Sequence, residues 1–444
     1  MAHVTEKYFN ELVETAQKLI RFDSSQKPAE GKYPFGKETA ECLDCFLEIA
    51  QNMGFSVRNY DHYVGEIEYG EGDDFAVLAH LDVVPAGKGW KYPPFAAIIN
   101  DDLSEGGVGG AKLWGRGTSD DKGPAVATLY ALKALKDEGF MPKRKIKFIL
   151  GCNEESGWAC IDHYKKVAKM PDEGFSPDAD FPAIFAEKGI LHFNAKFALK
   201  NPPFTSLSAG ERVNMVCGEA IATLTPEAAE KLKNYSNPVL GTVFTFDEQT
   251  NAVTVKGKSA HGSTPEKGAN ALGALLAFFA TLDDGCKRAY ELLFKDSTGL
   301  KQMHDLTGYL TLSPDVAAYE NGVLTITVDV RFPSTYTREE VKQRLQEGGL
   351  DYEVVSYQPP IYTDPESKLV KTLMRVYNEE TGRNESAVAI GGGTYARALK
   401  RGCGFGPCRE DEEAVAHQAN EYITLDSLKQ ITRIYYEAIK ALTE

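Results

Sequence analysis

The sequence predicts an α/β domain with a mostly parallel sheet, into which a second, α+β domain is inserted. Up to about residue 188, helical and strand patterns alternate, as they do when helices cover both faces of a parallel sheet. From about 189 to 363, several strands alternate apolar and polar residues instead, as antiparallel strands with one solvated face do. The earlier pattern then returns. At 444 residues the chain is long enough for two domains, which we place at 1–188 with 364–444 and at 189–363.

The individual elements follow from the hydrophobic period. Apolar residues at helical spacing predict helices near 5–22, 36–53 and 124–139, and apolar runs at 75–84 and 145–153 predict buried strands. The inserted segment has strand patterns at 190–199, 241–246, 251–257 and 322–332, with helical patterns at 225–235, 270–282 and 338–347. A Pro-rich segment at 357–365 precedes a further helix at 367–382, where the first domain resumes.

Composition excludes several classes of partner and location. The net charge of −15 repels phosphate backbones and anionic lipids, so neither nucleic acid nor a membrane surface is an expected partner. There is no run of eighteen apolar residues, and the first helix lacks the apolar core of a signal peptide, so we expect a cytoplasmic protein. Cys42 and Cys45 fall on the apolar face of a predicted helix, which favours core packing over metal or redox chemistry.

His80 and Asp82, in the stretch HLDVVP, follow an apolar strand. Residues two apart on a strand share a face, so Asp82 could hold one ring nitrogen of His80 and leave the other for a metal. The same spacing also suits a buried histidine that its neighbour merely satisfies. Open α/β sheets bind ligands at the carboxyl ends of their strands, which is where this pair lies.

Other acids stand at comparable places, and each has an ordinary structural alternative. Glu154 and Glu155 follow the strand at 145–153, although paired glutamates often begin a solvated helix. Asp120 lies in the glycine-framed GRGTSDDKG, where it could be a helix N-cap; this stretch is not a phosphate-binding loop. Asp178 and His417, taken singly, could be turn or surface residues.

Seven stretches in a fixed order nevertheless make the sequence recognisable. They are HLDVVP, GRGTSDDKGP, NEESGW, SPDADFPAIFAEKG, SAHGSTP, IGGGTYAR and AHQAN. Together they resemble the dinuclear zinc peptidase family that includes carnosinases, aminoacylase-1, acetylornithine deacetylase and succinyl-diaminopimelate desuccinylase, and most of all its PepV-type bacterial dipeptidases. The resemblance extends over essentially the whole chain.

The resemblance implies a zinc-peptidase catalytic domain with an inserted ferredoxin-like lid, and a pair of zinc ions in each chain. By the match, His80 and Asp178 would bind one ion, Glu155 and His417 the other, and Asp120 both. Asp82 would orient His80, and Glu154 would be the general base. Mn²⁺ or Co²⁺ could replace Zn²⁺, since carboxylate and imidazole ligands accept all three. Members of the family often have a cis peptide after the bridging acid, here Asp120-Asp121.

The resemblance also assigns residues to a small peptide substrate. His261 would steady the developing oxyanion, and Asn214 and Arg331 would bind substrate. The backbone of the glycine loop and a nearby arginine would face the substrate carboxylate; the residues are Gly392, Gly393, Thr394 and Arg397. Without the resemblance, His261 could be a turn residue, Arg331 a surface residue and the glycines a flexible turn. The large lid favours a monomer over the homodimer found in some relatives.

The predicted function is a metal-dependent dipeptidase that acts on dipeptides with a free amino terminus. The alternatives are an N-acyl-amino-acid deacylase of the same family, a binding protein that has lost the chemistry, and a thiol hydrolase using Cys152 or Cys403. One departure from the family is Asn153, where relatives commonly have Asp. Because Asn153 is not assigned as a ligand, we expect it to tune the site rather than abolish metal binding.

Overall fold

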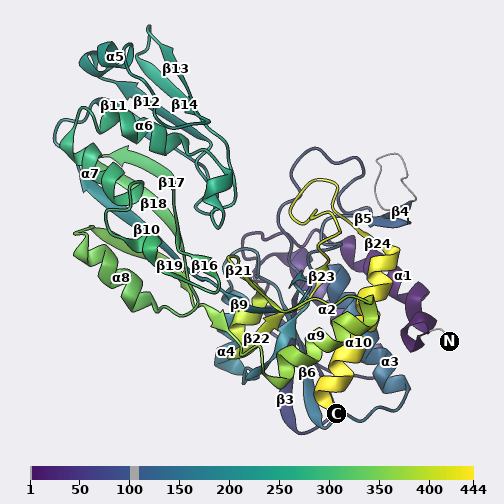
Figure 1. Cartoon of the computed structure of the whole chain (residues 1–444). Coiled ribbons are helices and arrows are strands. Elements are labelled where there is room, and N and C mark those ends of the chain that lie inside the picture. Colours follow the sequence, from purple (N-terminus) through teal and green to yellow (C-terminus); the bar gives the residue numbers. More distant parts are fainter. Residues whose placement is uncertain (1–2, 101–109) are drawn as a thin grey trace. The chain divides into compact units, whose positions relative to one another are not determined.

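The computed structural model describes residues 3–100 and 110–444, which form two compact units (Figure 1). Unit 1 comprises Met1–Phe185, Tyr362–Val388 and Thr394–Glu444, and unit 2 comprises Ala186–Ile361 and Ala389–Gly393. The fold class predicted from the sequence, an α/β domain with an inserted α+β domain, is confirmed. Among the described residues, no helix is long and apolar enough to span a membrane.

Unit 1 is built on a mixed sheet whose central strands are parallel. Strand β3 pairs in parallel with β6 on one side and β7 on the other, and β7 pairs in parallel with β22, whereas β1 and β2 add an antiparallel edge. The strand order begins β1-β2-β6-β3-β7-β22 and continues through β9 and β20, with β21 paired to β9. The bounds are β1 Ser56–Tyr60, β2 Val64–Tyr69, β3 Asp73–His80, β6 Arg144–Gly151, β7 Glu173–Ser176, β9 Ile184–Glu187, β20 Ile361–Tyr362, β21 Val388–Ile390 and β22 Arg401–Gly404.

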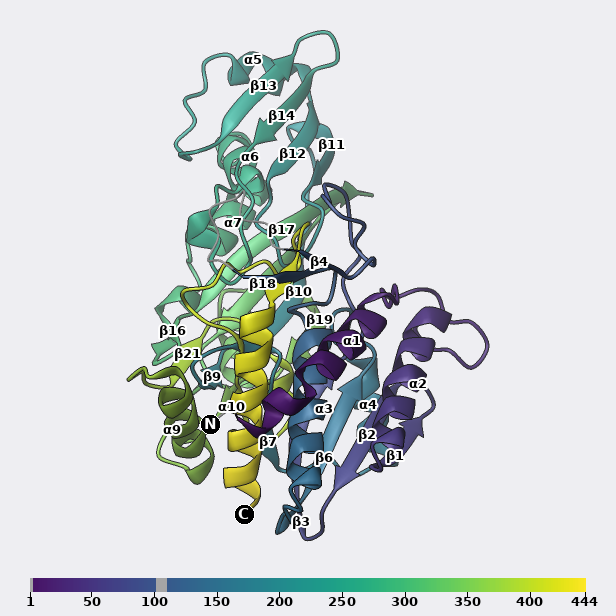
Figure 2. The ribbon, with the colours of Figure 1, turned by 90° about the vertical axis from the view of Figure 1, so that its right-hand side faces the viewer.

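Short sheets and helices complete unit 1. Helix α3 lies between α1 and α10 on one face of the sheet (Figure 2), whereas α4 contacts β2 from the opposite face, where Tyr164 hydrogen-bonds Glu66. The helices are α1 Phe9–Ile20, α2 Lys37–Asn52, α3 Lys122–Asp137, α4 Ala159–Val167, α9 Lys368–Thr381 and α10 Leu425–Thr443. The short strands are β4 Ile98–Asn100, β5 Lys112–Trp114, β8 Ala179–Asp180, β23 Pro407–Cys408 and β24 Tyr422–Thr424.

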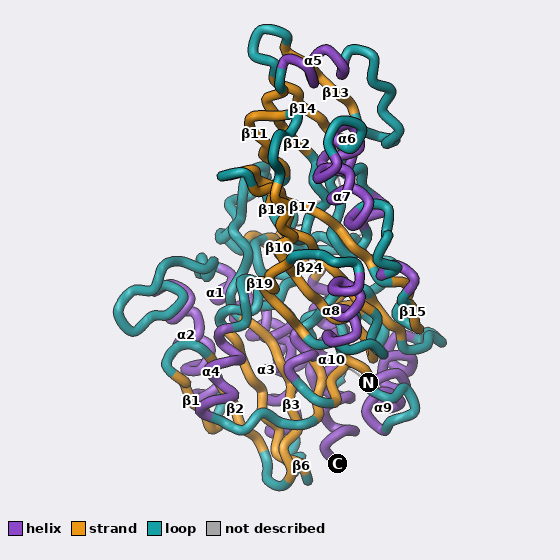
Figure 3. The backbone as a smooth tube through the Cα atoms, turned by 90° about the vertical axis from the view of Figure 1, so that its left-hand side faces the viewer, coloured by secondary structure: helices purple, strands orange, loops and turns teal. Residues whose placement is uncertain are grey.

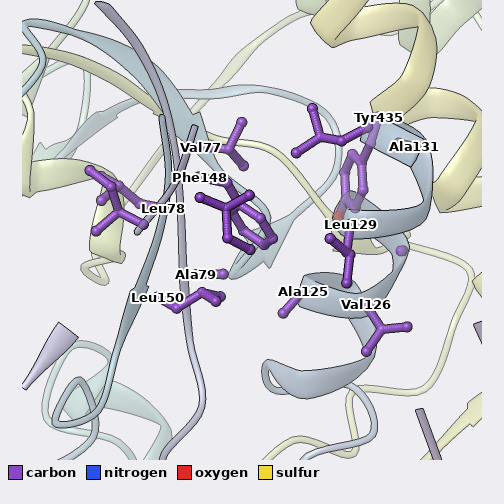
Figure 4. Packing of buried hydrophobic residues seen from close by; sticks show 14 of the residues in the cluster. Val77, Leu78, Ala79, Ala125, Val126, Leu129, Ala131, Phe148, Leu150 and Tyr435 are labelled. Atoms are coloured by element: carbon purple, nitrogen blue, oxygen red, sulfur yellow. The ribbon is translucent and has the colours of Figure 1, made fainter. Parts of the chain in front are cut away.

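The core of unit 1 explains why these segments fold as they do. Strand side chains alternate between the two faces, so Val77 and Phe148 point toward α3 whereas Leu78 points away from it (Figure 4). Helix α3 presents Ala125 and Leu129 to the sheet, and its other faces are also buried because α1 and α10 flank it. This packing fixes the strand ends on which the site is built.

Unit 2 is an antiparallel sheet with helices on one face (Figure 3). Its order is β13-β14-β12-β11-β17-β18-β10-β19, and its own core is separate from that of unit 1. The strands are β10 Gly189–Ala198, β11 Phe204–Ala209, β12 Glu219–Leu224, β13 Val243–Asp247, β14 Ala252–Lys256, β17 Thr311–Glu320, β18 Val323–Phe332 and β19 Tyr352–Gln358. The helices are α5 Pro226–Leu232, α6 Ala271–Phe279, α7 Asp284–Leu293 and α8 Arg338–Glu347, and a small hairpin joins β15 His304–Asp305 to β16 Gly308–Tyr309.

Candidate metal centre

The carboxyl ends of three neighbouring parallel strands deliver most of the candidate site. His80 is the last residue of β3, the Glu154-Glu155 pair follows β6, and Asp178 follows β7. Because parallel strands end at the same edge of the sheet, these side chains are brought together although they are far apart in the sequence. Asp120 reaches the same edge from the loop before α3, and the peptide bond that follows it is cis.

His80 stands at the centre of the first group of potential ligands. Its Nε2 lies 3.0 Å from Oδ1 of Asp120 and 3.5 Å from Oδ2 of Asp178. Glu154 belongs to the same cluster, since one potential ligand atom from each of His80, Glu154 and Asp178 lies within 4.8 Å of the others. The ring is fully buried, so its second nitrogen needs a partner inside the protein, and Nδ1 lies 2.9 Å from the carbonyl oxygen of Asp82.

His417 forms a second group on the other side of Asp120. Its Nε2 lies 2.9 Å from Oδ2 of Asp120 and 3.0 Å from Oε1 of Glu155. The two oxygens of Asp120 therefore face two different histidines, and each histidine also faces a second carboxylate. This arrangement is the geometry of a carboxylate that can bridge two cations.

The electrostatics of the cluster suit cations. Burial raises the pKa of Glu155 to about 7, with a further contribution from the negative charge of Asp120. Burial and the charge of Asp178 likewise raise the pKa of Glu154 well above its ordinary value. Although burial would lower the pKa of His417, its hydrogen bonds with Asp120 and Glu155 raise it to about 11. Imidazole nitrogens and carboxylate oxygens are ligands that Zn²⁺ accepts, so the residues present fit a divalent metal.

Asp82 does more than the sequence suggested. Its carboxylate lies 3.5 Å from Nδ1 of His80, farther than its own carbonyl oxygen. The two carboxylate oxygens instead accept the backbone N–H groups of Glu154 and Glu155, at 3.0 and 3.1 Å. Asp82 thus fixes the loop that carries both glutamates, while its backbone fixes the tautomer of His80.

Trp158 holds one of those glutamates. Its indole Nε1 donates to Oε1 of Glu154 at 3.0 Å, and its ring makes an edge contact with Tyr395. The residue adopts a left-handed backbone conformation, with φ of 67°, directly before α4. The carboxylate of Glu154 is therefore oriented by a side chain as well as by its position in the loop.

In unit 2, the three residues expected to meet substrate lie around a buried carboxylate, Asp329. Arg331 forms a fork on it, with Nε and Nη2 each within 2.9 Å of an oxygen. Gly262 connects His261 and Asn214 to this carboxylate. Its N–H donates to the carbonyl of Asn214. Its Cα lies so close to Asp329 that an added Cβ would be 2.3 Å from Oδ2.

His261 is set up as a donor. Its Nδ1 accepts the backbone N–H of Ser263 at 3.1 Å and lies 2.7 Å from the hydroxyl of the same residue. A neutral ring with Nδ1 accepting carries its proton on Nε2. That nitrogen can then donate a hydrogen bond to an oxyanion.

The glycine loop joins the two units along the chain. Gly392 and Gly393 belong to unit 2, whereas Thr394 and Arg397 belong to unit 1. Thr394 caps the short 3₁₀ helix Tyr395–Ala398 by accepting the N–H of Ala396, and both Thr394 and Arg397 are buried.

Comparison with known proteins identifies the family. Residues 76–441 match the model of peptidase family M20/M25/M40. The chain belongs to this family. A β-Ala-Xaa dipeptidase of Lactobacillus delbrueckii subsp. lactis is 34% identical, with 98% of this chain and 96% of that protein aligned.

Solved structures show the same fold at low sequence identity. A dipeptidase of Saccharomyces cerevisiae, Dug1p, matches with a TM-score of 0.61 at 14% identity, covering 99% of this chain and 97% of that one. Human carnosine dipeptidase 1 matches with a TM-score of 0.59 at 15% identity, over 99% and 97% of the two chains.

Asn153, directly before the paired glutamates, has a structural partner. The side-chain oxygen of Asn153 accepts the N–H of Ala159 at 3.0 Å, so Asn153 caps the start of α4.

Cys152 is buried, and burial raises the pKa of its thiol well above the ordinary value. A thiol kept protonated is a poor nucleophile, and Cys403 is buried in β22, which argues against a thiol hydrolase.

Two further residues near the candidate site were not predicted from the sequence. Asp121 accepts the backbone N–H of His80 at 3.0 Å and so ties the loop of Asp120 to the end of β3. Asp329 could have been found from the D-x-R pattern of β18, since residues two apart on a strand lie on one face. Asp121 carries no such signal, because only the fold brings it to His80.

Proposed function

We propose that this M20 peptidase is a metal-dependent dipeptidase that hydrolyses dipeptides with a free amino terminus. The observation that carries the proposal is the position of Asp120 between two histidines, each of which faces a further carboxylate. The name of the L. delbrueckii relative, a β-Ala-Xaa dipeptidase, supports the same reaction class.

We propose two Zn²⁺ ions per chain, with Mn²⁺ or Co²⁺ as substitutes. His80 and Asp178 would hold one ion, Glu155 and His417 the other, and Asp120 would contribute one oxygen to each. Bound divalent cations supply Lewis acidity, which polarises a scissile carbonyl and makes water more acidic.

Glu154 is the proposed general base. Burial and the charge of Asp178 raise the pKa of Glu154 well above its ordinary value, so its carboxylate is a stronger base than a free glutamate and suits a group that takes a proton from water and returns it to the leaving amine. Trp158 donates to Oε1 and Asp82 accepts the N–H of the Glu154 peptide unit, so the carboxyl group is held in one orientation.

The two units have different proposed roles. Unit 1 is the catalytic domain and unit 2 the lid, in which Asn214, His261 and Arg331 meet substrate. His261 would donate from Nε2 to the oxyanion. Asp329 holds the guanidinium of Arg331 in place through Nε and Nη2, and the positive charge of Arg331 would attract a substrate carboxylate. The glycine loop would contribute to carboxylate binding through four residues: Gly392, Gly393, Thr394 and Arg397.

We also propose that the protein is a monomer of the cytoplasm. All eight cysteines are free thiols, and seven of them are buried, as expected in a reducing compartment.

The deciding experiment is a substrate panel on the metal-loaded enzyme. Xaa-Ala dipeptides and β-Ala-His are compared with N-acetyl and N-succinyl amino acids, with Glu154→Gln as the matched inactive control. Turnover of the dipeptides supports the proposal. Turnover of the acylated amino acids alone would replace it with an N-acyl-amino-acid deacylase, and metal binding without turnover of either set would leave a binding protein.

A further inference from the structure

Glu421 is a fully buried carboxylate that the proposed chemistry does not use. It lies directly before β24, four residues after His417, and none of its surface is exposed. Its Oε2 forms an ion pair with Nη1 of Arg116 at 2.6 Å, and Arg116 is only 2% exposed. Replacing a buried ion pair by apolar residues is often neutral or stabilising, so fold stability alone does not account for this one.

The other carboxylate oxygen of Glu421 holds the loop that carries Asp120. Oε1 accepts the backbone N–H groups of Gly117 and Ser119 at 3.0 Å each, and that of Asp120 itself at 3.3 Å. The hydroxyl of Ser119 donates to the same oxygen at 3.2 Å. The backbone carbonyl of Glu421 also accepts the N–H of Gly115, so the loop is attached to this residue at several successive positions.

The segment before Glu421 carries the second histidine of the candidate metal centre. His417 and Asn420 adopt left-handed backbone conformations, with φ of 64° and 66°. The side chain of Asn420 accepts the N–H of Lys91 at 2.6 Å. His417 therefore extends from a short anchored stretch, and Glu421 joins that stretch to the loop of Asp120.

We propose that Glu421 is a positioning residue that sets the distance between Asp120 and His417, and thereby the affinity of the metal position that these two share with Glu155. The inference rests on the proposed function, because it assumes that the cluster binds metal. It predicts an asymmetry. The position at His417 depends on two elements that Glu421 joins. The position at His80 shares Asp120 with it, but its other ligands, His80 and Asp178, follow strands that Glu421 does not contact, so it should be affected less.

The test compares Glu421→Gln with a matched change on the same segment. Gln keeps the size of the side chain, but its amide group must face either Arg116 or the loop N–H groups, so a donor meets donors. Glu413→Gln is the control, because Glu413 is exposed and its carboxylate accepts the hydroxyl of Tyr422, which is not part of the loop of Asp120. Ser119→Ala, which removes one donor to Oε1, is the milder variant in case Glu421→Gln does not fold.

The measurement is a titration of the metal-free full-length chain with Zn²⁺ against a chromophoric chelator, and with Co²⁺ followed by its absorption spectrum. We expect wild type and Glu413→Gln to bind two equivalents. Glu421→Gln should weaken one equivalent by about 10–100-fold, the usual effect of removing an outer-shell partner of a ligand, and weaken the other, which shares only Asp120, by a smaller factor. Ser119→Ala should weaken the same equivalent by a smaller factor.

Equal weakening of both equivalents, or unchanged affinity in Glu421→Gln, would overturn the positioning role and leave Glu421 as a structural residue. If Glu421→Gln does not fold, unchanged affinities in Ser119→Ala would do the same. Failure of wild type to bind metal would instead refute the proposed function, which the wild-type titration reveals before any variant is compared.

Discussion

Asp315 in unit 2 gives a prediction that is independent of the metal centre. It is fully buried in β17, where the hydroxyl of Ser313 donates to one of its oxygens. Burial, together with the charge of Asp329, raises the pKa of Asp315 to about 8. The carboxyl group is therefore protonated in the folded protein at neutral pH, whereas it is ionised in the unfolded chain.

The sign of the effect follows from proton binding. Between about pH 4 and pH 8 the folded state holds a proton that the unfolded state has lost, so this group lowers the free energy of unfolding as the pH rises. Asp315→Asn cannot titrate and lacks this slope. Over the three units from pH 5 to pH 8, at about 1.4 kcal/mol per unit, the stability difference between variant and wild type changes by about 4 kcal/mol in favour of Asn. Any pH-independent effect of the amide side chain on the free energy of unfolding cancels from this change.

Calorimetric melting at several values of pH measures this change in the stability difference between Asp315→Asn and wild type. For a unit of this size, about 4 kcal/mol corresponds to a change on the order of 10 °C in the difference between the two melting temperatures. The exposed Asp351→Asn serves as the control and should follow wild type. Parallel curves for wild type and Asp315→Asn from pH 5 to pH 8 would refute the reasoning, because they would mean that Asp315 is ionised throughout.

Four further outcomes are expected. Glu154→Gln should lower kcat by about 10²–10⁴-fold while metal content, measured by elemental analysis, stays at the wild-type value; retained activity would remove Glu154 from the role of base. Asp82→Asn loses one of two acceptors for the loop N–H groups and should weaken Zn²⁺ binding by about 10–100-fold in a chelator competition, with a normal affinity contradicting that role. Gly262→Ala places a Cβ 2.3 Å from Oδ2 of Asp329 and should lower kcat/KM by up to about 10²-fold with metal content unchanged, whereas wild-type kinetics would show that the residues around Asp329 in unit 2 do not bind substrate. Chelation should abolish turnover and Zn²⁺ should restore it, while thiol alkylation of the native protein should have no effect because Cys152 is buried; the reverse pattern would favour a thiol enzyme.

The sequence predicts most of the regular elements because their hydrophobic periods are clear, and it fails where the chain departs from a period. The apolar run at 75–84 predicts a strand to its end, but β3 stops at His80, where the ring turns back to the carbonyl of Asp82. Strand β17 was not predicted. It contains Pro314 at a shift in register, and proline within a run is a signal against a strand except at such irregularities.

The candidate site is only partly readable from the sequence. The rule that ligands bind at strand ends locates His80 and Glu154, but nothing local relates Asp120 to His417, which lies almost three hundred residues farther along the chain. The resemblance to the family supplied that pair. The buried carboxylate of Glu421 remained hidden, because a glutamate between an asparagine and a tyrosine has no feature that distinguishes it from a surface residue.

The protonation of the two histidines makes metal binding depend on pH. The neighbouring carboxylates raise the pKa of His417 to about 11 and raise that of His80 well above its ordinary value, so each ring binds a proton more tightly than a free imidazole does. A proton on either ring balances part of the buried negative charge. Because a metal ligand must be a neutral imidazole, binding of a cation must displace the proton from each ring, and the cation then balances the same carboxylates. The carboxylates that make this edge of the sheet a candidate metal site therefore also make its metal affinity depend on pH, and binding should tighten as the pH rises.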